Sequence, residues 1–163
     1  MLTRPPFTRL FAFDHGFGNL PGHWPHFHRL VTDQARRHGL EVNIFGFSEI
    51  LPDLIGDLPA VRLFRHSPAT CLSPDIRENT ALRNEAFLAD LEQLDLADFG
   101  PQDLFLFTFV MNYELEGILR FARRFTPERA PVFVVLLQFD NGLSTEPEEE
   151  TEADLPWIIR FDR

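Results

Sequence analysis

The sequence of 163 residues contains no lysine, and all 15 of its basic residues are arginine. A P-loop, a Schiff base with pyridoxal phosphate and a lysine general base each need a lysine side chain, so these three kinds of site are excluded. Cys71 is the one cysteine, which excludes an internal disulfide and a thiolate metal cluster and favours a reducing cytoplasm. No apolar run approaches the ~20 residues that cross a bilayer, so we expect no membrane span.

Acidic residues are concentrated near the end of the sequence. Seven acids and no bases lie between Asp140 and Asp154. Without them the formal net charge of −10 would be −3, so the main body is only mildly acidic and nothing predicts a nucleic-acid surface. Acid runs of this kind are usually solvated, which makes residues 141–156 a predicted acidic linker or loop. Residues 157–163 (WIIRFDR) form a terminal apolar segment.

The main body alternates between strand and helix patterns. Short apolar runs predict strands, and apolar residues at spacings of three or four predict helices. The predicted strands are Arg9–Phe13, Leu40–Phe47, Val61–Phe64, Asp103–Val110 and Pro131–Phe139. The predicted helices are Pro21–His38, which Gly39 ends, Thr80–Leu96 and Tyr113–Phe125. This order predicts an α/β domain over residues 1–140, doubly wound and Rossmann-like, with a mostly parallel sheet and helices on both faces.

The stretch FDHGFGNLPGHWPHFH (residues 13–28) follows the first predicted strand and is rich in glycine and histidine. Ligands of doubly wound sheets bind beyond the carboxyl ends of the strands, and glycines there let backbone N–H groups approach an anion at a helix N-terminus. Gly16, Gly18, Gly22 and His23 are therefore candidate substrate-binding or phosphate-binding residues. Their spacing departs from G-x-G-x-x-G, and three glycines are also explained by a tight strand-to-helix turn that binds nothing.

Four histidines in this stretch raise the question of a metal site. His23 and His26 lie one turn apart on the predicted helix, whereas His28 points elsewhere and His15 precedes the helix. No acidic residue on that helix completes a ligand set. Histidines near a helix start more simply form local hydrogen bonds or face solvent, so we expect neither a metal nor a resident cofactor.

Further candidates follow the later strands, at the same expected edge of the sheet. Asn112 and Glu114 follow the fourth strand and are candidate catalytic residues, with Glu114 as a general base. Glu114 is also explained as an acid in the first turn of a helix, where it favours the helix dipole. Asp140 follows the fifth strand as a candidate binding residue, or as a turn residue before Gly142. No Gly-x-Ser-x-Gly elbow supports a Ser–His–Asp hydrolase.

Several of these passages carry a family resemblance. The first strand, the turn that ends in Gly22-His23 and the passage ARRHGLEVNIFGF are similar to the opening of many GT-B glycosyltransferases. The later passages NEAFLADLEQL, DLFLFTFVMNYELEGILRFARRF and APVFVVLLQFD resemble the helix–strand–helix–strand part of the same N-terminal domain in bacterial members. Two features depart from that pattern: Pro21 replaces the first glycine of a G-G-H-like turn, and no histidine follows the fourth strand, where some members place a catalytic one.

The resemblance covers roughly Arg9 to Asp140 and implies an enzyme that transfers a sugar from a nucleotide-sugar donor to a sugar or glycan acceptor. It implies that this domain holds mostly the acceptor, with the Gly22-His23 turn near the donor phosphates. The nucleotide-binding C-terminal domain of that family is not in this sequence, so we expect an enzyme completed by a C-terminal domain or a partner subunit. The alternative is a non-catalytic interaction module of α/β fold that contacts a partner or a second copy through Trp157-Ile158-Ile159, and a small hydrolase or flavodoxin-like binder is a third option.

Overall fold

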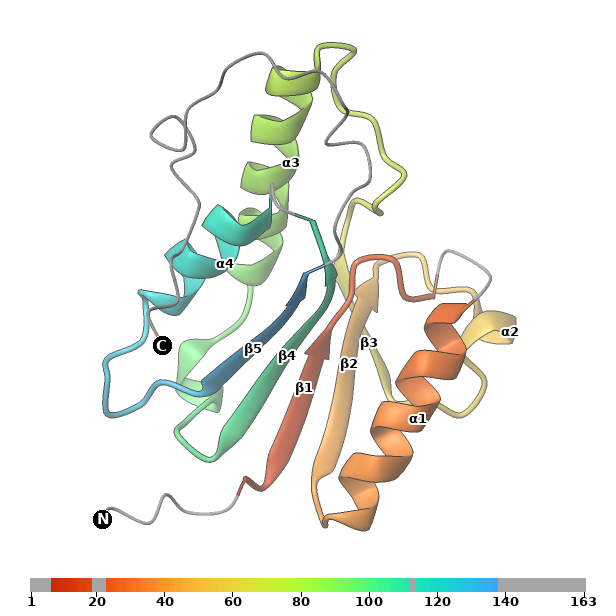
Figure 1. Ribbon diagram of the computed structural model, residues 1–163, viewed down its shortest axis with the longest axis vertical. Helices are drawn as coiled ribbons and strands as arrows, with labels where there is room; N and C mark the ends of the chain where they lie inside the picture. Colours follow the sequence, from red (N-terminus) through yellow and green to blue (C-terminus); the bar gives the residue numbers. More distant parts are fainter. Residues whose placement is uncertain (1–6, 19–22, 112–113, 138–163) are drawn as a thin grey trace.

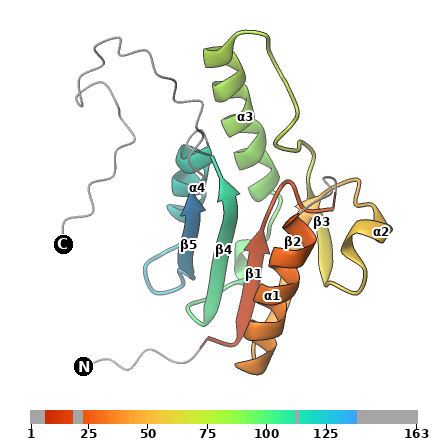
Figure 2. The same cartoon turned by 45° about the vertical axis from the view of Figure 1, so that its right-hand side comes forward.

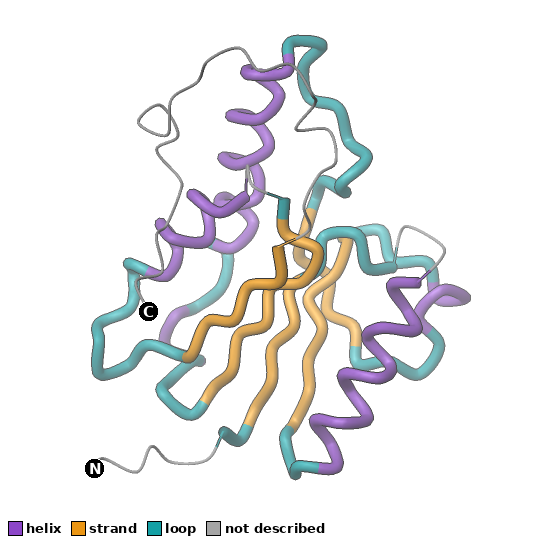
Figure 3. The backbone as a smooth tube through the Cα atoms, in the orientation of Figure 1, coloured by secondary structure: helices purple, strands orange, loops and turns teal. Residues whose placement is uncertain are grey.

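The protein is described by a computed structural model for residues 7–18, 23–111 and 114–137. Its sheet has five parallel strands in the order β3-β2-β1-β4-β5. The strands are β1 (Arg9–Phe13), β2 (Glu41–Phe47), β3 (Ala60–Phe64), β4 (Asp103–Val110) and β5 (Val132–Leu137). The helices are α1 (His23–Arg37), α2 (Pro52–Ile55), α3 (Ile76–Leu91) and α4 (Leu115–Ala122). This architecture, seen in Figure 1 and by secondary structure in Figure 3, confirms the predicted doubly wound α/β fold.

Two apolar clusters hold the helices to the sheet, one on each face. Successive strand residues point to opposite faces. In β1, Phe11 and Phe13 join the cluster of α3 and α4, whereas Leu10 and Ala12 join the cluster of α1. The α3–α4 cluster is built largely from phenylalanine, and each fully buried ring contributes about 1.5–3 kcal/mol through removal of its surface from water. The turned view of Figure 2 shows α1 on one side of the sheet and α3 with α4 on the other.

Helix α1 ends as its sequence predicts. Gly39 has a φ of +77°, and the N–H of Leu40 donates to the carbonyl of Ala35 at 3.0 Å. This is the Schellman arrangement, in which a left-handed residue, most often glycine, closes the last turn of a helix. The chain then enters β2 at Glu41, one residue after the predicted start at Leu40.

Helices α2 and α3 differ from the prediction. The four-residue α2 has Pro52 at its start and was not predicted, because it is too short to show a periodic pattern. Helix α3 begins at Ile76 instead of Thr80, because the Asp75 carboxylate accepts a hydrogen bond from the Glu78 N–H and caps the helix earlier. None of the helices in the described ranges is long and apolar enough to cross a membrane.

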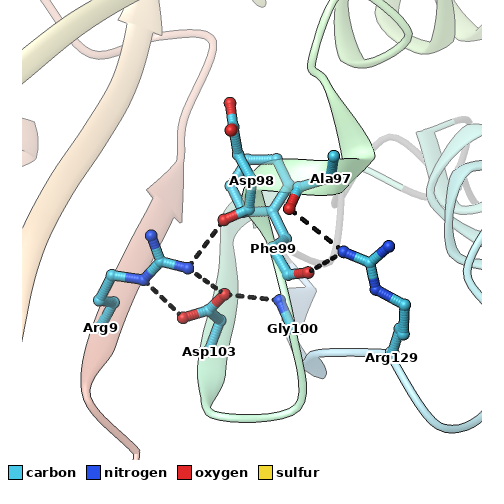
Figure 4. Close-up of polar contacts among 7 residues, drawn as sticks. All are labelled: Arg9, Ala97, Asp98, Phe99, Gly100, Asp103 and Arg129. Atoms are coloured by element: carbon cyan, nitrogen blue, oxygen red, sulfur yellow. Dashed lines mark hydrogen bonds and ion pairs between the residues drawn. The ribbon is translucent and has the colours of Figure 1, made fainter.

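The amino ends of β1 and β4 are joined by an arginine–carboxylate network (Figure 4). Arg9 donates from Nε and Nη2 to the two carboxylate oxygens of Asp103, at 2.8 and 2.7 Å, and also to the carbonyl of Asp98. Asp103 further accepts a hydrogen bond from the Gly100 N–H. The pKa of Arg9 is raised, chiefly because its guanidinium donates hydrogen bonds to Asp103. This paired network fastens two central strands at the edge opposite the carboxyl ends.

The strand order reverses at β1. The chain runs outward through β2 and β3 on one side of β1, and through β4 and β5 on the other. In open α/β sheets, ligands bind beyond the carboxyl ends of the strands at such a reversal. A ligand site in this fold is therefore expected at the segments that follow β1 and β4.

Candidate functional site

A buried histidine–glutamate pair lies at the reversal of strand order. His15 follows β1 and Glu114 follows β4, and the two strands are neighbours in the sheet. His15 Nε2 lies 2.9 Å from Glu114 Oε1, and the side chains are 4% and 2% exposed. The fold thus brings the candidate Glu114 against His15, which was expected to form local hydrogen bonds or face solvent and is instead buried.

The Glu114 carboxylate is fixed from two directions. Oε2 accepts a hydrogen bond from the Met111 N–H at 2.9 Å, while Oε1 faces His15. Glu114 also occupies the position just before α4, so its charge suits the helix dipole as the sequence predicted. A carboxylate held in this way keeps one oxygen directed at the imidazole.

The contact between His15 and Glu114 is a close approach of two side chains without a well-aligned hydrogen bond. The distance is short, yet His15 Nε2 has no hydrogen-bond partner of acceptable geometry. Poor alignment is common for the hydrogen bonds of catalytic pairs before a substrate binds, so the short distance is compatible with such a pair. With Nε2 turned toward the carboxylate, Nδ1 is the ring nitrogen that remains to take a proton from another group.

A second pair, Asp14 with His28, lies behind the turn that carries His15. Asp14 Oδ2 is 2.6 Å from His28 Nε2, and both side chains are completely buried. Asp14 Oδ1 also accepts the Gly16 N–H at 2.9 Å, and its carbonyl accepts the Phe17 N–H at 3.0 Å. Asp14 therefore ties the turn to α1 and limits the positions that His15 can take.

Sequence reasoning missed the pair of Asp14 and His28. The two residues are 14 positions apart, and His28 was expected to form local hydrogen bonds or face solvent. The structure corrects this expectation for His28, since α1 packs on the sheet and turns this histidine inward. An acid at the end of a strand followed by a histidine in the next helix is the signal that could have found the pair.

The two described glycines of the turn have local structural roles. The Gly16 N–H is already engaged by Asp14. Gly18 has a φ of +90°, and a Cβ there would lie 2.9 Å from Ile50 Cγ1. Both observations fit the explanation that these glycines form a tight strand-to-helix turn.

The remaining predicted site residues are only partly described. His23 is the first residue of α1, which places its backbone at the helix start next to the turn. Gly22, Asn112 and Asp140 lie outside the described residues. The structure therefore brings Gly16, Gly18 and Glu114 to one edge of the sheet.

A small cavity adjoins the His15–Glu114 pair. Its volume is ≈ 10 Å³, room for about one water-sized group. Its lining consists of His15, Phe64, His66, Ser67, Arg83, Phe87, Asp90 and Glu114. Both acids of the lining already have basic partners, because Asp90 Oδ1 lies 2.6 Å from Arg65 Nε and Glu114 faces His15. The cavity is thus large enough for one hydroxyl group, which would lie beside the imidazole of His15.

A larger hollow lies at the opposite edge of the sheet. It measures ≈ 490 Å³ and is lined by Thr8, Arg9 and residues 97–103. Arg9 and Asp103 in its wall are bonded to each other (Figure 4), and the hollow is at the amino ends of the strands. Ligand sites of this fold lie at the carboxyl ends, so the smaller cavity is the better candidate.

The backbone of β4 is strained where it approaches the site. Phe109 has a φ of +53°, and the pairing of β4 with β5 shifts register between Phe107 and Val110. A bulky residue in the left-handed region costs of order 1–3 kcal/mol, and such strain concentrates at functional sites. The strained residue lies two positions before Met111, whose N–H holds the Glu114 carboxylate.

The described ranges hold no group of three or more His, Cys, Asp or Glu side chains placed to bind a metal ion. The site consists instead of two separate acid–histidine pairs. Paired in this way, a carboxylate orients an imidazole and stabilises its protonated form. The pair of His15 and Glu114 lines a cavity, so proton transfer is a reaction step that this pair can perform.

No protein-family model, curated protein or solved structure matches this chain. A fold of this class hosts many unrelated activities, so the function has to be argued from the geometry of the site.

Proposed function

We propose that this chain is the acceptor side of a GT-B-type glycosyltransferase, in which His15 takes the proton from an acceptor hydroxyl. The observation that carries the proposal is the buried pair of His15 and Glu114 at the reversal of strand order, beside a cavity of hydroxyl size. In this proposal the general base is His15, and Glu114 orients it. The sequence resemblance supplies the substrate class, a nucleotide-sugar donor with a sugar or glycan acceptor.

The proposed reaction is a single displacement. The acceptor oxygen attacks the anomeric carbon of the donor sugar and forms the new glycosidic bond. The bond from that carbon to the phosphate oxygen breaks, and the nucleoside diphosphate leaves with the electron pair. The acceptor proton moves to His15 Nδ1, and the Glu114 carboxylate, 2.9 Å from Nε2, stabilises the resulting imidazolium. General base catalysis of this kind contributes about 10²–10⁴-fold in rate.

The size of the cavity limits how an acceptor can bind. A hollow of ≈ 10 Å³ admits one hydroxyl and no ring. The acceptor would therefore place a single hydroxyl beside His15 and lie outside the cavity with the rest of its atoms. The donor phosphates would approach the start of α1, near Gly18, Gly22 and His23, where the helix dipole favours an anion.

The donor site would be completed by a C-terminal domain or a partner subunit. The described residues form one sheet with its helices, and most nucleotide contacts would come from that second domain or subunit. We place the protein in the cytoplasm, where Cys71, which is exposed, stays reduced.

The test is a thermal-shift screen of the chain with UDP, GDP, their sugars and simple sugar acceptors. A ligand that binds only the folded protein stabilises it, by about 2.7 kcal/mol when the ligand concentration is 100 times its Kd. The temperature of the unfolding midpoint rises as a result. We expect a shift with an acceptor sugar or a nucleotide sugar, and its loss in His15→Gln. The matched control is His38→Gln, since His38 is exposed beyond the end of α1. A shift that is equal in both variants would contradict the proposed site.

A further inference from the structure

One part of the sheet is apolar and uncovered. Leu104 and Leu106 of β4 belong to the face that carries α1, and by alternation so do Val134 and Leu136 of β5. Val134 is 36% exposed and Leu136 is 42% exposed. Figures 1 and 2 both show α1 lying beside β2, with no described helix over β4 and β5 on that side. We refer to these four residues as the open face.

Such exposure is unusual for parallel strands. Parallel sheets occur almost only with both faces covered, because helices pack on either side of the strands. On the opposite face, Phe133 and Val135 of β5 pack against the cluster of α3 and α4. The open face is thus the part of a two-sided sheet that lacks its covering layer among the described residues.

The usual right-handed crossover argues against another strand–helix–strand unit beyond β5 as the covering layer. Crossovers between parallel strands are right-handed in about 98% of cases. The steps from β3 to β4 and from β4 to β5 run in one direction and place α3 and α4 on the far face. A further step outward from β5 would place its helix on that same far face. The open face therefore needs a segment that crosses to the α1 side.

We propose that the apolar segment Trp157–Phe161 of this chain covers the open face. Four of its five residues are large and apolar (Trp157, Ile158, Ile159 and Phe161). The free energy falls when apolar side chains of this kind are removed from water. The acidic residues before this segment are poorly suited to burial. In this proposal they stay in solvent, and the apolar segment alone contacts the open face.

The connecting chain is long enough for this docking. Residues 138–156 provide 19 positions between the end of β5 and Trp157. A chain of that length spans up to roughly 60 Å when extended and about 24 Å on average when flexible. The acids of the connection also complement the exposed Arg36 and Arg37, which lie on α1 on the same side of the sheet. Attraction of this kind acts over about 10 Å at moderate salt.

The test uses Trp157 as a fluorescent probe in the full chain. Trp24→Phe removes the other of the two tryptophans. Acrylamide quenching then reports how accessible Trp157 is, compared with a free peptide of residues 154–163. In this background Leu136→Gln removes one large side chain from the open face, and Leu82→Gln is the matched control, because both leucines are 42% exposed and Leu82 lies on α3.

We expect Trp157 to be protected in a monomer, and Leu136→Gln to weaken docking about tenfold while Leu82→Gln leaves quenching unchanged. Three results would overturn the proposal. Quenching equal to that of the free peptide would show that the segment does not dock. Protection that Leu136→Gln leaves unchanged would place the segment elsewhere. Protection that appears only with dimer formation in light scattering would make a second copy the occupant.

Discussion

Removal of the Asp14 carboxylate is the perturbation with the largest expected effect on folding. In Asp14→Ala, the buried His28 loses the carboxylate 2.6 Å from its Nε2, and its Nδ1 already has no hydrogen-bond partner. The Gly16 N–H loses its acceptor as well. Breaking a buried acid–base pair by removing one partner costs about 3–5 kcal/mol, a large fraction of the 5–15 kcal/mol by which domains are stable. We expect a loss within that range.

The assay is urea unfolding followed by circular dichroism, with the free energy extrapolated to water. Asp33→Ala is the control, because Asp33 is an exposed acid on α1 and its loss should change stability by less than about 0.5 kcal/mol. The double variant Asp14→Ala/His28→Leu removes both members of the pair and should recover about 1–2 kcal/mol of the loss. A cost below about 1 kcal/mol for Asp14→Ala would refute the reasoning, since the pair would then contribute no more than a surface contact.

Two further substitutions test the packing and the amino edge of the sheet. In Gly46→Ala, the new Cβ would lie 2.7 Å from the backbone oxygen of Phe17, so we expect a loss of about 1–3 kcal/mol in the same urea assay. Gly100→Ala, where a Cβ meets nothing within 4 Å, should leave stability almost unchanged. Equal losses of stability in the two variants would count against a close contact between position 46 and the Phe17 backbone. Arg9→Ala leaves a buried carboxylate without its bidentate partner and should cost about 2 kcal/mol. Arg29→Ala, which breaks an exposed ion pair of 3.7 Å, should cost less than about 0.5 kcal/mol. A larger loss of stability for Arg29→Ala than for Arg9→Ala would contradict the account.

The order of strands and helices was predictable because each element carries a local pattern. The run Asp103–Val110 is apolar at nearly every position, as is typical of a strand in a parallel sheet, and its observed bounds are the predicted ones. Gly39 marked the end of α1 for a purely local reason. The start of α3 was placed too late because the cap at Asp75 lies within a polar stretch that looked like loop.

The site was predictable only in part. The position of Glu114 at the end of a strand marked it as a candidate, since parallel strands bring their carboxyl ends to one edge. Its pairing with His15 depends on β1 and β4 being neighbours, which strand order decides and no local pattern reveals. The pairing of Asp14 with His28 likewise depends on how α1 packs against the sheet. Local chemistry can be read along the chain, but partners across the sheet follow from topology.

The most direct test of the proposed site is histidine side-chain NMR of the full chain, during titration with a nucleotide sugar and an acceptor sugar that the thermal screen identifies. The His15 signals are assigned by their absence in His15→Gln. The account predicts that these signals move as ligand is added, while those of the exposed His38, beyond the other end of α1, stay in place. If a bound ligand leaves the His15 signals unchanged, the pair of His15 and Glu114 is not the site of proton transfer.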